Sequence, residues 1–404
     1  MLCEILQHSG QVLGVFSCAN SIYHVEAYLD HAATTPMNPV ALQAQIQASS
    51  LIGNPSGSHR AARVAKDLLE RSREEVGALL GVAASEVVFT SGGTESDNLA
   101  IFGSIGDGKI AVCSTIEHHA VLDSVNAYGG KLIGVTRSGV IDLEGLESLL
   151  KEGGERVGVV SVMAANNETG VVQPLAEVCA LVRRYAPRAL CHTDAVQVPS
   201  YLDVGKITAG FDLVSISGHK FGGPKGIGAL IVRRPVSIKA LFHGGGQERE
   251  LRSGTQNLAG AAAMAAALRD AAENRDKNVR RISMLTEKLR GGLSAKLAAI
   301  KPNGVDEMQM CNITNYCFDG LNSEEILFLL DSAGVYASAG SSCASGALNP
   351  SHVLLEMGRS KSEASGSLRL SLGVTTTEEE VEYAIEVVAS VVRELAIKKG
   401  ALWI

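Results

Sequence analysis

The run VGVVSVM (157–163) is followed by LAEVCALVRRYA (175–186) and then by ALCHTDA (189–195). The first and third runs are short and apolar, as buried strands are, whereas the middle run has the apolar spacing of an amphipathic helix. A strand, a helix and a second strand in this order predict a βαβ unit, in which the two strands lie parallel in one sheet.

The same alternation extends in both directions from this unit. Strand-like runs precede it at EVVFT (86–90), IAVCS (110–114) and KLIGV (131–135), and FDLVSIS (211–217) follows it. Helical spacing lies between them, which predicts a mostly parallel sheet with helices on both faces. We place this large α/β domain at residues 37–280.

The pattern changes after Asn257, where long helices rich in Ala and Leu begin. Two further strand-like runs, CNITNYCFDG (311–320) and SLRLSLG (367–373), precede a terminal helix that starts after a run of threonines. This part predicts a smaller α+β domain at residues 281–404. Residues 1–36 are expected to form a separate N-terminal segment, an extension up to about residue 27 followed by the entry to the functional site.

Composition limits the classes of protein to which the chain can belong. Of its 404 residues, 46% are hydrophobic and 20% charged, as in globular proteins with a sizeable core. The formal charge of −7 disfavours binding to nucleic acids or anionic membranes. Eight cysteines without a CxxC pair indicate reduced thiols rather than a disulfide framework.

Targeting segments are not evident either. The first basic residue is Arg60, so the start of the chain has neither the basic region of a secretory signal nor the arginines of a mitochondrial one. No apolar run reaches the roughly 18 residues that a transmembrane helix needs. These features predict a cytoplasmic protein.

The lysine in SISGHKFGGPKGIG (215–228) has the setting of a reactive amine. Lys220 follows an apolar strand, and three glycines within three residues of it allow the backbone to turn sharply. A partly desolvated lysine at a strand end suits Schiff-base chemistry with an aldehyde cofactor, and Ser217 and His219 beside it could bind a phosphate. Taken alone, the motif leaves a solvated surface lysine equally open.

Two further motifs fit the same chemistry. SGGTES (91–96) lies between a strand and a helix, where glycines and hydroxyl groups can cradle a phosphate at the positive end of the helix; an ordinary capped turn is the alternative. Asp194 in CHTDAVQ (191–197) ends a strand, where ligands of α/β proteins bind. An anionic Asp194 could keep a pyridine nitrogen protonated, or it could simply cap the segment that follows.

Phosphate cradle, aspartate and lysine occur in the order typical of fold-type I pyridoxal-phosphate enzymes. More specifically, the chain resembles the cysteine desulfurases, in particular the group that supplies sulfur for iron–sulfur cluster assembly and tRNA thiolation. The motifs that carry the resemblance run from Tyr28 to Gly373: YLDHAATTP, NPSGSH, SGGTESDNLAI, EHHAVL, NNETGVVQP, HTDAVQ, SGHKFGGPKGIG, RSGTQN, SSCASGALNPSHVL and SLRLSLG.

The resemblance implies a large domain with a sheet of the seven-stranded type, a smaller α+β domain, and a homodimer that binds pyridoxal 5'-phosphate. In the family pattern Lys220 bonds covalently to the cofactor and moves the substrate's Cα proton, and Asp194 pairs with the ring nitrogen. The pattern assigns the other cofactor contacts to Gly93, Thr94, Ser217 and His219 at the phosphate, to Thr255 reaching across from the partner subunit, and to Asn167 and Gln197 at the ring oxygen.

The substrate side of the resemblance involves two further residues. His118 in EHHAVL matches the histidine that stacks on the cofactor ring, where a flat group that titrates near neutrality can exchange protons. Arg369 in SLRLSLG matches the clamp for the carboxylate of L-cysteine, which Asn167 also contacts. The neighbouring His119 could suggest a metal, but adjacent residues of a helix do not converge on one ion, and we expect no metal site.

Cys343 is the predicted carrier of sulfur. It lies in SAGSSCASGALNP (338–350), a small polar stretch without apolar periodicity that predicts an exposed, mobile loop. In the family, such a thiolate attacks the sulfur of L-cysteine, releases L-alanine and keeps the sulfur as a persulfide for an acceptor or cluster-scaffold protein. The other seven cysteines are expected to be small buried residues.

Two alternatives remain at this point. A selenocysteine lyase, another fold-type I lyase or an aminotransferase could share the large-domain motifs, although Cys343 in its loop disfavours an aminotransferase. A non-catalytic binding protein could also keep the fold. The joint presence of Lys220, Asp194, His118 and Arg369 argues against that alternative.

Overall fold

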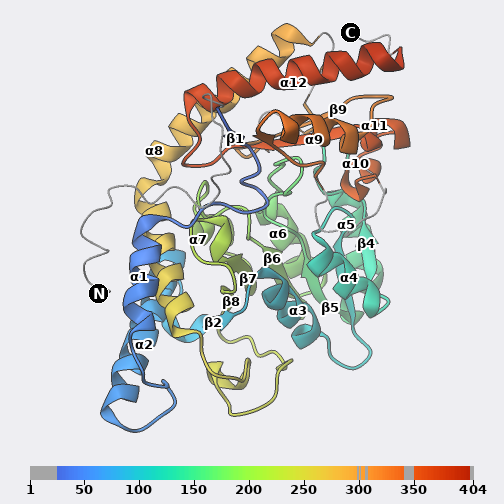
Figure 1. The fold of residues 1–404 in the computed structure, drawn as a ribbon. Coiled ribbons are helices and arrows are strands. Elements are labelled where there is room, and N and C mark those ends of the chain that lie inside the picture. The colour runs from blue at the N-terminus through green and yellow to red at the C-terminus, as the bar shows by residue number, and fades with distance from the viewer. Residues whose placement is uncertain (1–24, 298–299, 301, 305–307, 341–349, 401–404) are drawn as a thin grey trace, which may run out of the picture.

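A seven-stranded sheet forms the centre of the computed structural model, which describes residues 25–297, 300, 302–304, 308–340 and 350–400 (Figure 1). The strand order is β2-β8-β7-β6-β5-β3-β4. The strands are β2 (Val87–Thr90), β3 (Ile110–Ser114), β4 (Lys131–Ile133), β5 (Val157–Ser161), β6 (Leu190–Asp194), β7 (Leu213–Ser217) and β8 (Gly228–Val232). Strand β8 is antiparallel to both of its neighbours, and the other pairs are parallel, which confirms the mostly parallel sheet.

Helices cover both faces of this sheet. Successive side chains of a strand point to opposite faces, and a strand such as β2 contributes apolar side chains to both of them. In β2, Val87 and Phe89 join one apolar core, whereas Val88 between them joins another. The first core includes residues of α1 (Pro39–Ser49), α2 (Arg60–Leu80), α5 (Leu143–Gly153) and α6 (Leu175–Tyr185). The opposite face packs against α3 (Gly93–Ser104) and α4 (His119–Ala127).

One long helix, α8 (Leu258–Lys296), belongs to two cores. Its first part is rich in alanine and packs in the core of the large sheet. Its second part contributes Ile282, Leu285, Leu289 and Leu293, which are spaced three or four residues apart, to a separate core. The boundary that we placed at residue 280 lies inside this helix, and the division into two domains stays a prediction.

The second core contains an antiparallel pair of strands, β9 (Ile313–Cys317) and β11 (Ser367–Ser371). The N-terminal segment also contributes, because β1 (Ala27–Tyr28) pairs with β10 (Val335–Tyr336) and buries Ala27. The other helices here are α9 (Ser323–Ser332), α10 (His352–Glu356), α11 (Lys361–Ser365) and α12 (Glu378–Lys399). Helix α12 begins at a capping box of Thr377 and Glu380, close to the start predicted from the threonines.

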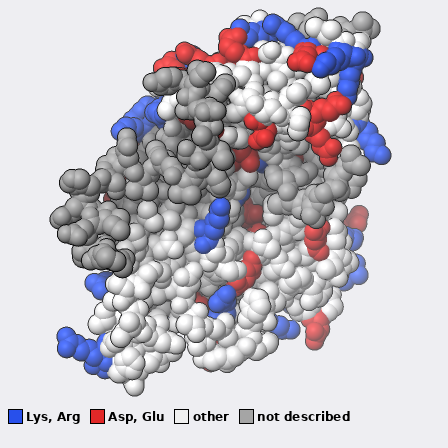
Figure 2. Space-filling model, in the orientation of Figure 1, with Lys and Arg blue, Asp and Glu red and all other residues white. Residues whose placement is uncertain are grey.

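Charged side chains gather over α12 on the face shown in Figure 2, with both signs intermixed. Ion pairs account for part of this mixture, as between Lys296 and Glu386 or Lys399 and Glu325. Among the helices of the described residues, which include the short α7 (Val204–Ile207), none is long and apolar enough to cross a bilayer.

Candidate active site

A pocket of about 270 Å³ lies where the strands of the large sheet end. It is lined by residues that follow the carboxyl ends of β2, β3, β5, β6 and β7, and by Arg369 of β11 in the second core. This is the edge at which open α/β sheets bind ligands. Ten predicted site residues line it: Gly93, Thr94, His118, Asn167, Asp194, Gln197, Ser217, His219, Lys220 and Arg369.

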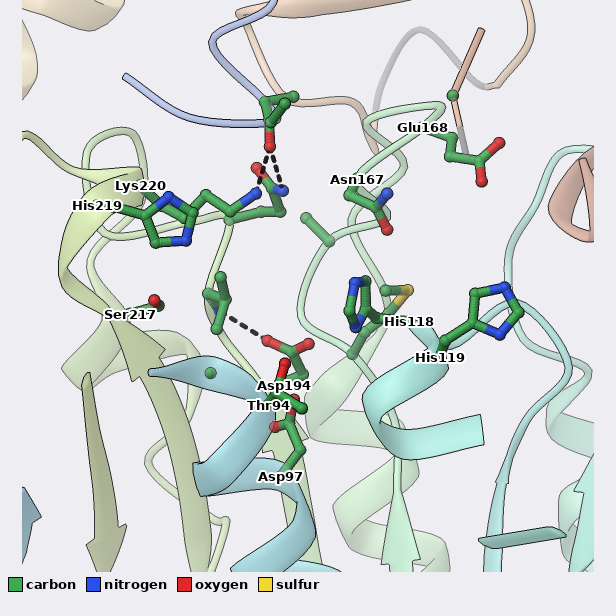
Figure 3. Close-up of a pocket in the computed structure, with 18 of the residues that line it drawn as sticks. Thr94, Asp97, His118, His119, Asn167, Glu168, Asp194, Ser217, His219 and Lys220 are labelled. Carbon is green, nitrogen blue, oxygen red and sulfur yellow. Dashed lines mark hydrogen bonds between the residues drawn. The ribbon is translucent and has the colours of Figure 1, made fainter. Parts of the chain in front are cut away.

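Lys220 enters the pocket directly after β7, in a 3-10 turn formed by Gly218–Lys220. Its Nζ donates a hydrogen bond to the carbonyl oxygen of Ala32 at 2.5 Å, and Nε2 of Gln197 donates to the same oxygen at 2.9 Å (Figure 3). The N-terminal segment thus supplies the acceptor that holds the lysine amine inside the pocket.

Asp194 ends β6 with its carboxyl group 7% exposed. One oxygen accepts from the backbone N–H of Val196 at 2.8 Å. Burial raises the pKa of Asp194, while the neighbouring His118 and Lys220 favour its charged form. A buried carboxyl group whose charged form is favoured by its neighbours is suited to hold a protonated ring nitrogen.

A second buried carboxyl group, that of Asp97 in α3, lies behind Asp194. Burial, together with the charge of Asp194, raises the pKa of Asp97 well above its ordinary value. Its Oδ1 lies 3.6 Å from Nε2 of His192, whose own pKa burial lowers to about 3. Two carboxylates so close together do not both ionise without cost, so a cation beside Asp194 would relieve the repulsion.

His118 precedes α4 and acts as its N-cap, since its Nδ1 accepts from the backbone N–H of Ala120 at 3.1 Å. This bond fixes the tautomer, because a nitrogen that accepts cannot carry the proton of a neutral ring. Burial lowers the pKa of His118, and Asp194 acts in the opposite direction. The neutral ring with its proton on Nε2 faces the pocket as a flat group that can exchange protons.

The end of the pocket next to the start of α3 is suited to bind an anion. Helix α3 starts after Gly92, which has no side chain with which to cap the first N–H groups. A Cβ on Gly93 would come within 2.8 Å of Cγ2 of Val196, so a side chain there would force the turn apart. Ser217 and the imidazole of His219 complete this end, and burial lowers the pKa of His219 to about 4.

Arg369 crosses from β11 to the pocket and is 1% exposed. Its Nη2 donates to Oδ1 of Asp30 at 2.6 Å, and its Nη1 donates to the carbonyl oxygen of Asn167 at 2.8 Å. Its Nε is buried and has no partner among the described residues. A buried donor that lacks a partner is expensive, so this nitrogen points to an acceptor supplied by a ligand.

One further predicted site residue is described, and it does not line the pocket. Thr255 is exposed on the surface of the chain, away from the pocket lining. Cys343 lies outside the described residues. Conversely, four titratable residues that the sequence did not assign to the site also line the pocket: Asp97, Glu168, His119 and His352. No group of three potential metal ligands occurs among the residues that the structure describes.

For the activity that the resemblance to the cysteine desulfurases implies, replacing Asp194 by asparagine is expected to lower the rate of alanine formation from L-cysteine about 10²- to 10³-fold, the typical effect of removing one preorganised electrostatic contact. The amide cannot stabilise a positive charge, whereas its size preserves the bond from Val196 N–H. The check is kcat at saturating L-cysteine, corrected for bound cofactor. A rate within threefold of wild type would contradict the assignment.

Comparison with known proteins matches the class-V aminotransferase family over residues 27–384. An IscS-like cysteine desulfurase of Mycobacterium tuberculosis is 40% identical over 380 residues, which cover 91% of this chain and 96% of that protein. The chain belongs to the class-V aminotransferases, among the cysteine desulfurases. The IscS cysteine desulfurase of Dictyoglomus turgidum is 36% identical, with 92% of this chain and 95% of that protein covered.

Solved structures agree with this membership. A NifS-like protein of Rickettsia africae superposes with a TM-score of 0.83 at 32% identity, covering 91% of this chain and 99% of that structure. SspA, solved in complex with cysteine, has a TM-score of 0.74 at 29% identity and covers 87% of this chain and all of its own. The fold is therefore that of the fold-type I enzymes, as predicted.

Class-V aminotransferases and cysteine desulfurases depend on pyridoxal 5'-phosphate. The pocket of this family member fits that cofactor. Its uncapped helix end suits the phosphate, the buried carboxyl of Asp194 suits the ring nitrogen, and the amine of Lys220 lies in the same pocket for the aldehyde. The repulsion between the carboxyls of Asp97 and Asp194 is the feature that a protonated ring would relieve.

Proposed function

We propose that this chain converts L-cysteine to L-alanine and holds the sulfur as a persulfide on Cys343 for transfer to an acceptor protein. The observation that carries the proposal is the convergence in one pocket of Lys220, His118 and Asp194 with a buried arginine whose Nε has no described partner. Together they supply an amine, an acid–base group, a counter-charge and a carboxylate clamp.

Each residue has a task in this reaction. Lys220 holds the cofactor and moves the Cα proton of the substrate, and His118 is placed to exchange a further proton. Arg369 binds the substrate carboxylate, and Asn167 lies beside it. When bound, the cofactor supplies an electron sink for the carbon centre that loses its proton. Asp194 sustains that sink by keeping the ring nitrogen protonated.

Sulfur transfer requires a thiolate near the substrate's Sγ. Gly340 lines the pocket, and Cys343 follows it by three residues, so the chain limits the separation of their Cα atoms to about 11 Å. The thiolate of Cys343 forms a bond to Sγ while the bond from Sγ to Cβ breaks, and its electron pair stays with carbon. After protonation, alanine leaves and the persulfide remains.

We further propose that the protein acts as a homodimer in the cytoplasm, with Thr255 reaching the phosphate of the other subunit. The exposure of Thr255 in the single chain supports this arrangement, because an exposed hydroxyl can serve a neighbouring site. Sulfur acceptors in cluster assembly or tRNA thiolation are the expected partners, in keeping with the cysteine desulfurase relatives.

A sulfur balance tests the proposed function. We expect one alanine for each sulfur delivered to a thiol acceptor, and in the absence of an acceptor a single sulfur added to Cys343, detected by peptide mass spectrometry. Alanine without any protein-bound sulfur would contradict the persulfide.

Arg369→Lys provides a separate test of the clamp. We expect KM for L-cysteine to rise about 10- to 100-fold, as for the loss of a charged hydrogen bond, because lysine lacks the planar pair of donors. Cofactor content should stay at the wild-type level. The measurement is KM and kcat side by side. An unchanged KM would show that the carboxylate binds elsewhere.

A further inference from the structure

Glu168 lies one residue beyond Asn167 at the edge of the pocket and belongs to a rigid turn (Figure 3). Oδ1 of Asn166 accepts from the backbone N–H groups of Glu168 at 2.9 Å and of Thr169 at 3.0 Å. Nδ2 of Asn166 donates to the carbonyl oxygen of Ile116 at 3.1 Å, which ties the turn to the end of β3. The position of the Glu168 backbone is thus fixed by buried hydrogen bonds.

The side chain of Glu168 is 1% exposed, and its Oε2 accepts a hydrogen bond from Oγ of Ser351 at 2.5 Å. Ser351 is itself 3% exposed and is the N-cap of α10, where its Oγ accepts from the backbone N–H of Leu354 at 3.2 Å. The carboxyl group therefore holds the chain at the point where α10 begins, just after residues 341–349.

Oε2 of Glu168 also lies close to the chain just before residues 341–349. A Cβ on Gly340 would come within 2.5 Å of Oε2 of Glu168, and Gly340 has a φ of +109°. The backbone N–H of Gly340 donates to Oγ of Ser338 at 3.2 Å, and its carbonyl oxygen accepts from Nη1 of Arg369 at 3.3 Å. Position 340 therefore needs a glycine for the chain to pass this close to the carboxylate of Glu168.

We propose that Glu168 is a positioning residue for sulfur transfer, whose carboxyl group fixes the chain at Ser351, just after the segment 341–349, and packs against Gly340 just before it. The inference rests on the proposed function, in which this segment carries the sulfur acceptor Cys343. None of the predicted cofactor contacts involves Glu168, so its partners indicate its task. Its carboxyl group accepts a hydrogen bond from Ser351 after the segment, and it lies so close to Gly340 before the segment that a side chain there would collide with it.

Burial of a carboxyl group costs free energy that its contacts must offset. Burial raises the pKa of Glu168, whereas the hydroxyl of Ser351 and the charge of Arg369 favour its ionised form. An apolar residue at this point would avoid the cost but would release Ser351. The bond to Ser351 fixes the chain where it enters α10, and orientation of reacting groups is worth large factors in rate.

The experiment compares Glu168→Ala with Glu168→Gln in the full-length enzyme loaded with pyridoxal 5'-phosphate. Three quantities are measured: cofactor content, the change in the visible spectrum when L-cysteine is added, and the single-turnover rate at which persulfide forms on Cys343. For Glu168→Ala we expect the first two to match wild type and the third to fall about 10- to 100-fold. Glu168→Gln keeps an oxygen that accepts from Ser351 and should stay within about threefold of wild type, as for a conserved neutral hydrogen bond.

Gly340→Ala is the matched variant at the other end of the segment and needs no change to Glu168. Its Cβ would collide with Oε2, so we expect the same selective loss of persulfide formation. This variant decides the matter if Glu168→Ala does not fold. Persulfide formation at the wild-type rate in Glu168→Ala or Gly340→Ala would overturn the inference, as would loss of the spectral response to L-cysteine in Glu168→Ala. Absence of persulfide in the wild-type enzyme would instead refute the proposed function.

Discussion

Lys220→Ala is expected to reduce alanine formation at least about 10⁴-fold, the upper range for loss of a general acid–base group. The reason is that the Nζ amine both holds the cofactor and moves the Cα proton, and no other lysine lines the pocket among the described residues. Cofactor should still bind through the phosphate end and the aspartate, but it should be released on denaturation even after borohydride treatment, which in the wild type fixes it to Lys220. The measurement is alanine production at saturating L-cysteine.

Lys225→Ala is the matched control, because Lys225 is an exposed lysine of the same loop. We expect its activity to stay within about twofold of wild type, as for most surface substitutions. If Lys220→Ala keeps more than a tenth of the wild-type rate, Lys220 is not a catalytic residue.

Cys343→Ala is expected to abolish protein-bound persulfide and to slow alanine formation about 10³-fold, because no thiolate then attacks the substrate sulfur. The spectral response of the cofactor to L-cysteine should persist, since Lys220 and Arg369 are intact. Protein-bound sulfur and alanine are measured in the same samples.

Cys311→Ala serves as the control for a thiol lost from a half-buried position in the second core. It should leave both quantities close to wild type. If sulfide still forms from L-cysteine at the wild-type rate in Cys343→Ala, the sulfur does not pass through this residue.

Much of the large domain could be predicted from the sequence because the two periodicities, of strands and of helices, alternate along it. Strand β8 was missed: its run GALIV follows PKGI, and a strand antiparallel to its neighbours does not extend the βαβ pattern. Helix α1 was missed too. Its apolar residues, including Val40 and Ile46, are largely exposed rather than confined to one stripe, so the sequence there has little helical periodicity.

The site was predicted to the extent that its residues end strands or begin helices next to them. Asp97 was missed because it lies within a helical run, and its contact with Asp194 depends on the order of strands in the sheet. Glu168 was within a recognised motif, but its role depends on Ser351, which is 183 residues further along the chain. Such contacts become visible only when the fold brings distant segments together.

The visible absorption spectrum of the purified protein, recorded while L-cysteine is added and alanine is assayed, tests the central claim most directly. We predict a yellow protein whose absorption band shifts on addition of L-cysteine as alanine accumulates. A band that stays unchanged with no alanine formed would contradict cysteine desulfurase activity, and a colourless protein that takes up no pyridoxal 5'-phosphate would contradict the assignment of the pocket itself.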